Sequence, residues 1–456
     1  MTMQAVGKYR WTICALLFFA STINYLDRQV LSLLQPYLAE TFNWTNTDYA
    51  NITAVFQFFY AFSMLFAGRI IDKLGTKNGY SLAIIIWSVA AIIHALAIPI
   101  GENISALFGW AGIAGFSVSV LGFMFSRAIL AFGEAGNFPA AIKATAEYFP
   151  KKERSLATGI FNSGTNVGAI LAPLTVPWIR LNWGWEMAFV IMGVIGFIWL
   201  IFWMIVYKKP ENQKRLSVEE LAYINGGEEE IPTAVNTEPV KERVLWIKLL
   251  GYKQTWAFTF GKFMTDGVWW FFLFWLPAYL KAQYGLVDKA VILPLAALYT
   301  MAMFGSIAGG WFPIYFIKKG SNVYDGRMKA MFLIALFPLV VLAAQPLGYI
   351  SFWIPVLLIG IGASAHQAWS ANIFTTVSDM FPKKAIGSVV GIGGMAGGLG
   401  GVVMSKLGGA LFDHYKALGH IQTGYTIMFT ICAVGYLIAW VVMKALVPKY
   451  KPITDL

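Results

Sequence analysis

The sequence predicts an all-α polytopic membrane protein with twelve transmembrane helices arranged as two six-helix bundles. Three observations support this prediction: apolar segments recur along the whole chain, basic residues collect in alternate loops, and one sequence element occurs twice. Of the 456 residues, 58% are hydrophobic and only 12% are charged, whereas soluble domains average about 25% charged residues. Such pervasive hydrophobicity excludes a soluble domain with a single anchor.

Twelve segments are apolar over the length of about 20 residues that a helix needs to cross a bilayer. In the first half of the chain they lie near residues 10–33, 48–67, 79–98, 117–144, 154–180 and 186–207. In the second half they lie near residues 254–280, 291–316, 329–346, 350–379, 386–411 and 423–446.

Basic residues are distributed asymmetrically between the loops. Of the 34 lysine and arginine residues, 25 fall at the termini, in alternate loops or in the central stretch from Lys208 to Lys253. The positive-inside rule then places both termini in the cytoplasm, as expected for a multi-pass protein of the inner cell membrane. The net charge of +11 therefore indicates membrane orientation rather than nucleic-acid binding. The exceptions in the intervening loops are Arg180, Lys281, Lys289 and Lys416.

The cysteines indicate no covalent framework. Only Cys14 and Cys432 occur, both in predicted spans, so neither disulfides nor a metal cluster are implied, and no cofactor is expected. The first apolar segment is interrupted by Asp27 and Arg28 and lacks a small-residue cleavage site. We therefore expect no removable signal peptide.

A repeated element supports the division into two bundles. Residues 148–152 read Tyr-Phe-Pro-Lys-Lys and residues 380–384 read Met-Phe-Pro-Lys-Lys, an offset of 232 in a chain whose half length is 228. In both copies we expect the proline to end a helix at the cytoplasmic face. We interpret the recurrence as a duplicated six-helix unit. Small residues at 391–401, matched by Gly159–Gly168 in the first half, predict faces of close helix packing.

A polar linker separates the two halves. Within it, Ser217 precedes Glu220 by three residues, which is a capping-box pattern, and Gly226-Gly227 supplies a stop. We therefore expect a short surface helix near 218–225 that is solvated and only tethers the bundles. The predicted domains are residues 1–207, a cytoplasmic linker at residues 208–252, and residues 253–456.

Two pairs of full charges lie inside predicted spans. Asp27 and Arg28 fall in the first span, and Arg127 and Glu134 fall in the fourth. A charge at the bilayer centre costs roughly 2.5–3.5 kcal/mol on insertion scales, so such residues persist where a polar cavity or a partner receives them. They are therefore the first candidates for the functional site.

Arg28 suggests the charge of the substrate. Its guanidinium presents five donors in a fixed fork and keeps its charge when desolvated, which suits it to a carboxylate. A permanent cation in a central cavity predicts an anionic substrate. The alternative is that Arg28 pairs only with an acidic residue of the protein, although Asp27, one residue and about 100° away around the helix, is poorly placed for this.

Arg127 and Glu134 are seven residues apart and share one helix face, about 10 Å apart along the axis. Both can line a cavity without pairing, which would leave Glu134 free to titrate. Burial favours the neutral carboxyl and a nearby arginine favours the charged one. Glu134 and Asp27 are therefore predicted to change protonation as access to water alternates. The alternative is a static ion-pair network between the first and fourth spans.

Other spans supply further candidates. Lys262 and Asp266 are four residues apart and are predicted to pair, either structurally or as part of a gate. Trp269 and Trp270 can stack on a sugar or simply pack. His366 is expected to form hydrogen bonds rather than to titrate. The remaining candidates carry groups that bind a polyhydroxylated ligand, namely Tyr60, Asn162, Thr165, Asn166, His366, Gln367, Ser370 and Asn372, of which the last four are expected to form one cluster.

The loop after the second span reads Gly-Arg-Ile-Ile-Asp-Lys-Leu-Gly-Thr-Lys. It resembles the signature loop of the major facilitator superfamily, in which acidic and basic residues form a latch that favours one of the two access states. The second half has Ile314 where the acid would stand, so the latch is expected to be one-sided. The resemblance implies a cytoplasmic gate at Gly68, Asp72, Lys73, Gly75 and Lys77.

Three further stretches, Tyr25–Arg28, Gly136–Pro139 and Ala365–Ala368, narrow the resemblance. The first two are similar to elements of the anion:cation symporter family. The third carries a closer likeness to its bacterial hexuronate transporters, which nearly the whole chain resembles. This resemblance implies proton-coupled import of glucuronate or galacturonate. Gly394 departs from it, because some of these symporters place a substrate-binding Asn there, and Asp27 stands where some have an uncharged residue.

We therefore predict a symporter that imports an organic anion, most specifically a hexuronate or related sugar acid, by alternating access and with proton coupling. A sodium symporter and an organophosphate antiporter, in which Lys262 would supply a second cation, are alternatives within transport. A membrane-embedded enzyme or receptor is disfavoured, because no catalytic motif and no large extramembrane domain occurs. The expected partners are a small anionic solute, protons or sodium, and the lipid bilayer, with the chain acting as a monomer.

Overall fold

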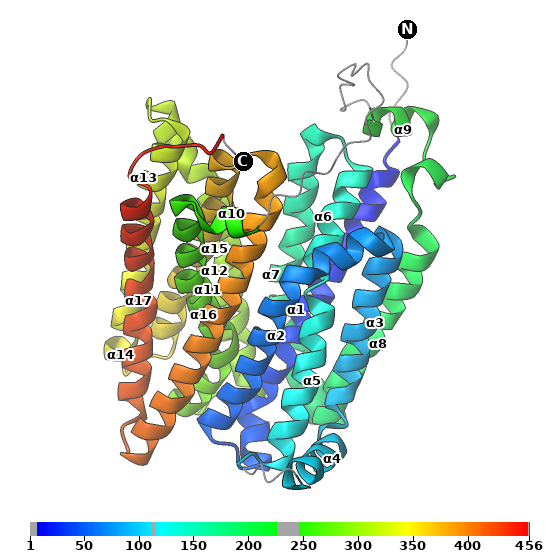
Figure 1. Ribbon diagram of the computed structural model, residues 1–456. Coiled ribbons are helices and arrows are strands. Elements are labelled where there is room, and N and C mark those ends of the chain that lie inside the picture. Colours follow the sequence, from blue (N-terminus) through cyan, green and yellow to red (C-terminus); the bar gives the residue numbers. More distant parts are fainter. Residues whose placement is uncertain (1–6, 111–114, 226–245, 455) are drawn as a thin grey trace.

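A computed structural model describes residues 7–110, 115–225, 246–454 and 456, and every regular element among them is a helix (Figure 1). Two bundles stand side by side, and the N- and C-terminal ends of the chain lie at the same end of the molecule. The first bundle contains α1 (Tyr9–Thr41), α2 (Asn46–Leu74), α3 (Thr76–His94), α4 (Ala97–Trp110), α5 (Val118–Glu134), α6 (Asn137–Tyr148), α7 (Lys151–Trp183) and α8 (Trp185–Val206). The second contains α11 (Lys253–Tyr284), η2 (Asp288–Val291), α12 (Ile292–Lys318), α13 (Val323–Leu336), η3 (Phe337–Ala343), α14 (Ala344–Leu347), α15 (Trp353–Met380), α16 (Lys383–Ala417) and α17 (Ile421–Leu446). Between them in sequence lie η1 (Pro210–Asn212), α9 (Val218–Asn225) and α10 (Trp246–Leu250).

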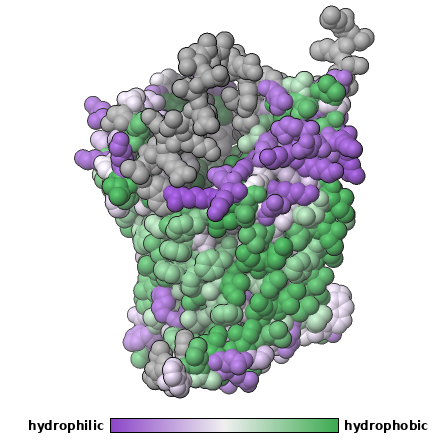
Figure 2. Space-filling model, turned by 45° about the vertical axis from the view of Figure 1, so that its right-hand side comes forward, coloured by the Kyte–Doolittle hydropathy of each residue, from purple (hydrophilic) through white to green (hydrophobic). Residues whose placement is uncertain are grey.

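Each of the twelve predicted spans coincides with one or more of these helices. Among the described residues, eight segments are long and apolar enough to cross a membrane by length and composition alone. The remaining spans, α1, α7, α11 and α15, are 33, 33, 32 and 28 residues long and carry most of the predicted site residues. Figure 2 shows a broad apolar band with polar residues gathered toward its ends, as expected for helices that traverse a bilayer.

The fourth predicted span is confirmed as one segment, Val118–Tyr148, of 31 residues that is long and apolar enough to cross a membrane. Helix α5 ends at Glu134 and α6 begins at Asn137, and the two residues between them, Ala135 and Gly136, keep helical φ and ψ angles. The segment packs closely on α3, because a Cβ added to Gly133 would lie 2.4 Å from the backbone nitrogen of Trp87. Glu134 therefore lies where α5 meets α6, inside the predicted span.

Two further boundaries differ from the prediction. The third predicted span divides into α3 and an additional helix, α4, which lies at the end of the molecule opposite the termini (Figure 1). The ninth changes from α13 into the 3₁₀ segment η3, whose second residue is Pro338. A proline has no backbone N–H group to donate, so the helical hydrogen-bond pattern is interrupted at this position.

The repeated Phe-Pro element has the same backbone conformation in both halves. Phe149 has φ −125° and ψ 133°, and Phe381 has φ −114° and ψ 144°. Pro150 (φ −61°, ψ 152°) is the N-cap of α7, and Pro382 (φ −63°, ψ 149°) is the N-cap of α16. Each proline holds the phenylalanine before it in an extended conformation, which ends the preceding helix at Tyr148 or Met380 as predicted, and it is also the N-cap of the next helix.

Glycine faces bring equivalent helix pairs together in the two halves. In the first half α7 packs on α1, and a Cβ added to Gly168 would lie 2.3 Å from the carbonyl oxygen of Thr22. In the second half α16 packs on α11, and a Cβ added to Gly400 would lie 2.0 Å from the carbonyl oxygen of Phe263. The predicted packing faces of small residues are confirmed.

The two halves are joined by polar contacts at the end of the molecule opposite the termini. Asp413, near the end of α16, accepts hydrogen bonds from the backbone N–H groups of Asn46 and Thr47 at 2.8 and 2.7 Å. Its carboxylate thus caps the first turn of α2, where the helix dipole favours negative charge. Two ion pairs of 2.5 Å accompany this cap, Lys281–Glu40 and Arg180–Asp288.

Helices α2 and α16 pack closely near Gly398, because a Cβ added to this residue of α16 would lie 2.5 Å from the Cβ of Ala61 of α2. A Cβ added to Gly394 would lie 3.4 Å from Cε of Met64 of α2. Farther toward the end that carries the termini, a Cβ added to Gly391 or to Gly68 would meet no atom within 4 Å, so these two glycines face open space.

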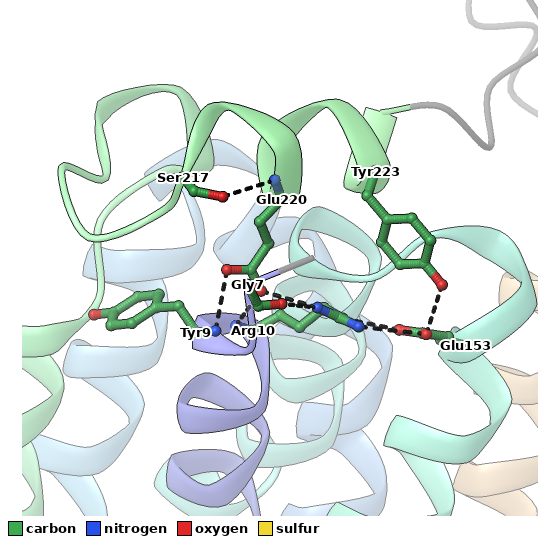
Figure 3. A network of polar contacts seen from close by, with 7 residues as sticks. All are labelled: Gly7, Tyr9, Arg10, Glu153, Ser217, Glu220 and Tyr223. Atoms are coloured by element: carbon green, nitrogen blue, oxygen red, sulfur yellow. Dashed lines mark hydrogen bonds and ion pairs between the residues drawn. The ribbon is translucent and has the colours of Figure 1, made fainter. Parts of the chain in front are cut away.

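The predicted linker helix is present as α9, but it is not a solvated tether. Ser217 Oγ accepts a hydrogen bond from the Glu220 N–H at 3.1 Å, as the capping pattern predicts. The Glu220 side chain, only 1% exposed, instead caps α1. It accepts from the N–H groups of Tyr9 and Arg10 at 3.1 Å and from Arg10 Nη1 at 3.0 Å (Figure 3).

The same network reaches α7. Arg10 Nε pairs with Glu153 at 2.9 Å, and the Tyr223 hydroxyl donates to Glu153 at 2.8 Å (Figure 3). Helix α9 is thereby fixed to the first half of the chain. The predicted stop at Gly226-Gly227 lies outside the described residues.

Candidate functional site

Arg28 lies in a box of four aromatic rings drawn from both halves, which we call the Arg28 box. The guanidinium carbon is 4.7 Å from the ring centroid of Tyr25, 5.4 Å from that of Phe56, 4.8 Å from that of Tyr60 and 5.1 Å from that of Trp270. Aromatic faces attract cations. The box therefore stabilises the charge of a residue that is only 2% exposed.

Glu134 pairs with Arg28, which corrects the expectation that this carboxyl is free. Glu134 Oε2 accepts from Arg28 Nε at 2.8 Å and from Nη2 at 2.6 Å, and both side chains are buried. Arg28 thus has the acidic partner that stood as the alternative to substrate binding. Both donors converge on one oxygen, and Glu134 Oε1 has no hydrogen-bond partner among the described residues.

A second arginine and a second acid lie beside this pair. Arg127 Nη2 donates to the carbonyl oxygen of Arg28 at 3.3 Å, and its guanidinium is 5.3 Å from the Phe56 ring. Asp27 interacts electrostatically with both Arg127 and Glu134. In the described part of the chain, Asp27 Oδ2 and Arg127 Nε and Nη1 have no hydrogen-bond partner, although both residues are buried. Two cations and two acids therefore share one region of low dielectric.

The predicted pair in the seventh span is present. Lys262 Nζ lies 2.5 Å from Asp266 Oδ2 and 4.3 Å from the ring centroid of Phe374. A Cβ added to Gly397 would lie 2.3 Å from Asp266 Oδ2, so the carboxylate packs directly on α16. Asp266 precedes Trp270 of the Arg28 box by four residues in α11, so the two side chains lie on the same face of this helix.

Trp269 and His366 lie together in the second half. Their rings stack at 5.0 Å between centroids with an interplanar angle of 7°, and His366 Nδ1 is 2.8 Å from the Tyr436 hydroxyl. The hydrogen-bonding role expected for His366 is thus directed at a neighbouring helix. Trp270, the adjacent residue, points instead to Arg28.

The four polar residues predicted in α15 do not form one cluster. Asn372 Nδ2 donates to the carbonyl oxygens of Gly309 and Ala368, each at 2.8 Å. Its amide therefore holds α12 against α15, and His366 is bound to Tyr436. Gln367 and Ser370 are half-buried.

The predicted residues of α7 lie on the helix that packs against α1. Thr165 and Asn166 are each 7% exposed, and Thr165 Oγ1 donates to the carbonyl oxygen of Asn162 at 2.8 Å. The described hydrogen bonds do not join them to Arg28. These residues therefore lie on a helix that packs against α1, and their part in the site stays a prediction.

The predicted gate is a tight turn between α2 and α3 at Gly75, whose φ of +78° favours glycine. Asp72 pairs with Lys143 of α6 at 2.8 Å. Lys77 Nζ donates to the carbonyl oxygen of Met204 at 2.7 Å. Of the remaining predicted gate residues, Gly68 is half-buried and Lys73 is exposed.

A hollow of about 520 Å³ lies elsewhere, in the second half. Gln283 and Tyr284 at the end of α11, Gln345 of α14 and Gln422 at the start of α17 contribute to its lining. None of the predicted site residues lines it. The predicted central residues are instead packed around Arg28 and Trp269.

Sequence reasoning missed two rings of the Arg28 box. Tyr25 precedes Arg28 by three residues, and Phe56 precedes Tyr60 by four. Both spacings place side chains on the same face of a helix. The signal was therefore present in the sequence for each ring once Arg28 and Tyr60 had been selected.

Sequence reasoning also missed a row of polar contacts between the two halves of the chain. Ser405 Oγ donates to Gln57 Oε1 at 3.0 Å, and Gln29 Nε2 donates to the Tyr299 hydroxyl at 2.8 Å. Lys406 donates to the side-chain oxygen of Asn51. These pairs join residues more than 250 positions apart, so spacing within one helix does not reveal them.

Comparison with known proteins agrees with this architecture. The family model described as Major Facilitator Superfamily matches residues 17–405. The hexuronate transporter of Escherichia coli (strain K12) is 30% identical over 448 residues, which cover 97% of this chain and 96% of that protein. The galacturonate transporter of Dickeya chrysanthemi is 32% identical over 316 residues, which cover 69% of this chain and 85% of that protein. The crystal structure of a D-xylose-proton symporter superposes with a TM-score of 0.70 at 14% identity, covering 97% of this chain and 98% of that one, and is similar in fold.

Proposed function

Because the chain belongs to the major facilitator superfamily and is a multi-pass membrane transporter rather than an enzyme, we propose that it imports a hexuronate or related sugar acid by proton symport. The similarity to proteins named hexuronate and galacturonate transporters supports the substrate class. The observation on which the coupling rests is the buried ion pair of Arg28 with Glu134.

The charges of the site favour one proton for each singly charged substrate. Arg28 and Arg127 offset Glu134 and Asp27 when all four are ionised. A substrate carboxylate adds one negative charge, and an uncompensated charge in this buried region is costly. A proton on Glu134 or Asp27 restores neutrality, so substrate and proton bind more favourably together than separately.

The geometry supports an exchange of carboxylates at Arg28. Protonation weakens the hold of Glu134 on the two guanidinium donors, which are then available to the substrate carboxylate as a bidentate pair. Tyr60 and Trp270 border the same guanidinium and offer aromatic faces to the C–H surface of a sugar ring. Recognition would thus combine charge at one end of the substrate with stacking along it.

Transport by alternating access is supported by the asymmetry between the two ends. The halves are held together by the Asp413 cap at one end, whereas Gly391 of α16 and Gly68 of α2 face open space toward the other. We propose that both termini are cytoplasmic in the inner membrane, as the basic loops indicate. The Asp413 cap then lies at the outer end of the transporter.

An organophosphate antiporter is less well supported. The relatives that support the substrate class are named hexuronate and galacturonate transporters. A sugar acid is therefore the better supported substrate.

The test is uptake by the full chain in proteoliposomes. Labelled glucuronate, galacturonate and galactonate are supplied with and without an inward pH gradient, and then with a sodium gradient at fixed pH. We expect concentrative uptake of a hexuronate driven by the pH gradient. Uptake that follows sodium at fixed pH would replace the proton with sodium, and exchange that requires internal phosphate would overturn the symporter.

A further inference from the structure

Three polar contacts follow one another along the facing surfaces of α2 and α16. From the closed end inward they are Asn46 with Asp413, Asn51 with Lys406, and Gln57 with Ser405. We call this row the seam. In this order the residue numbers rise along α2 and fall along α16, so the two helices run antiparallel. Gln57 marks the innermost contact.

Gln57 is the member of the seam whose amide nitrogen is buried and has no hydrogen-bond partner among the described residues. Its Oε1 accepts from Ser405 Oγ at 3.0 Å, and its side chain is 0% exposed. Its Nε2, which carries two N–H donors, has no hydrogen-bond partner among the residues that the structure describes. Buried polar groups are almost always bonded, so a free amide end here calls for a ligand.

The free amide end adjoins the Arg28 box. Gln57 directly follows Phe56 and lies one helical turn from Tyr60 on the same face of α2. A Cβ added to Gly401 would lie 2.8 Å from Trp270 Cδ1 and 3.0 Å from Gln57 Cδ. Glycine at 401 therefore leaves room for the indole and the amide side by side, and that indole covers the Arg28 guanidinium.

We propose that Gln57 is a specificity-determining residue that binds a hydroxyl group of the substrate through the free end of its amide. The inference rests on the proposed function, in which Arg28 holds the carboxylate. A hydroxyl both donates and accepts, so it satisfies whichever end of the amide Ser405 leaves unbound. The class of ligand selected is an anion that carries a hydroxyl within reach of its carboxylate.

The same arrangement connects occupancy to the contact between the halves. One end of the Gln57 amide holds Ser405 of the second half, and the other end holds the substrate. A bound hydroxyl thus fixes the rotamer of the side chain that joins α2 to α16. The substrate hydroxyl is therefore recognised at the contact between the two halves.

The test measures discrimination between substrates rather than uptake alone. Full-length protein in proteoliposomes is assayed for inhibition of labelled galacturonate and glucuronate uptake by each parent acid and by its single-deoxy derivatives. The variants are Gln57→Leu, which removes the amide at similar size, and Gln57→Asn as a milder change. Asn51→Leu, in the next contact of the seam, and Ser405→Ala are the matched controls.

For one deoxy position we expect the wild type to prefer the parent acid by roughly three- to tenfold, the ratio that one net hydrogen bond supplies. Gln57→Leu should reduce that ratio to about one, mainly by weakening the parent acid. Asn51→Leu and Ser405→Ala should lower uptake of all ligands together and preserve the ratio. Gln57→Asn should retain an intermediate ratio if Gln57→Leu does not fold.

The proposal is overturned if Gln57→Leu or Gln57→Asn keeps the wild-type ratio at every deoxy position, because Gln57 then acts only in the seam. A wild type that transports no sugar acid at all would reject the proposed function instead. The two failures are therefore distinguishable in the same set of measurements.

Discussion

Both hydrogen bonds from the Arg28 guanidinium to Glu134 end on the same carboxylate oxygen, Oε2, at 2.8 and 2.6 Å. The second oxygen, Oε1, has no partner in the described part of the chain. The carboxylate therefore holds the arginine by one edge and leaves an oxygen that can take a proton without moving away. This relationship makes Glu134 the first residue to test for coupling.

Replacement of Glu134 by Gln should abolish accumulation driven by a pH gradient. The amide cannot carry or release the proton, yet it still occupies the space beside Arg28. Exchange of internal for external substrate should stay within about threefold of wild type, because no net proton movement is needed. Counterflow and gradient-driven uptake of labelled hexuronate in proteoliposomes measure the two activities. Unchanged concentrative uptake would remove Glu134 from the coupling step.

Replacement of Arg28 by Lys should weaken substrate binding by about 10- to 100-fold. Lysine keeps the charge but loses the planar fork that binds a carboxylate through two donors and stacks on aromatic rings. The measurement is the KM for hexuronate uptake. Arg327→Lys is the matched control, since Arg327 also forms a 2.9 Å ion pair, with Asp379, outside the site. Equal effects of the two substitutions would argue against a special role for Arg28.

Replacement of Asp413 by Asn should favour the conformation that is open at the end opposite the termini. The carboxylate caps the N-terminus of α2 from the other half, and such a charge contributes about 0.3–1 kcal/mol, equivalent to a two- to fivefold change in the equilibrium. Distances between spin labels at the exposed positions 41 and 416 report the opening.

The control for this change is Asp48→Asn. Asp48 accepts from the Thr45 N–H at 3.0 Å in the same turn of α2 but lies within the first half. It should destabilise the helix start to a similar degree and leave the label distances unchanged. Matching distance changes in both variants would mean that the cap acts on α2 alone.

Replacement of Glu220 by Gln should lower the melting temperature and make α9 accessible to protease. The neutral amide would set an N–H donor against the N–H groups of Tyr9 and Arg10, at a cost of about 1–3 kcal/mol. Thermal unfolding and limited proteolysis measure the effect. Glu219→Gln changes the neighbouring exposed residue and should be neutral. A neutral Glu220→Gln would show that α9 is held by other contacts.

The twelve spans and the duplication were predictable because a bilayer imposes a length and an apolar composition on each helix. The close packing of Gly133 against Trp87 was not, since it depends on another helix. The pairing of Lys262 with Asp266 was predictable because the two residues lie on one helix face. The pairing of Arg28 with Glu134 was not, because it joins positions 106 residues apart.

The linker also contains a contact between distant parts of the chain that the sequence did not predict. The sequence around Ser217 and Glu220 predicted a helix correctly, because the cap involves neighbouring residues. It did not predict that the Glu220 carboxylate turns to the start of α1, 210 residues away in the chain. Neighbouring residues determine the start of α9, whereas the contact of the Glu220 side chain with α1 depends on how the helices pack.

Because α9 is attached to α1 and α7, this helix keeps a fixed position on the first bundle. A fluorophore on Val218, which is 81% exposed, would travel with that bundle as a rigid body. Paired with a second fluorophore on the opposite bundle, it would time any relative movement of the two bundles from the end that carries the termini, without altering any residue near the solute.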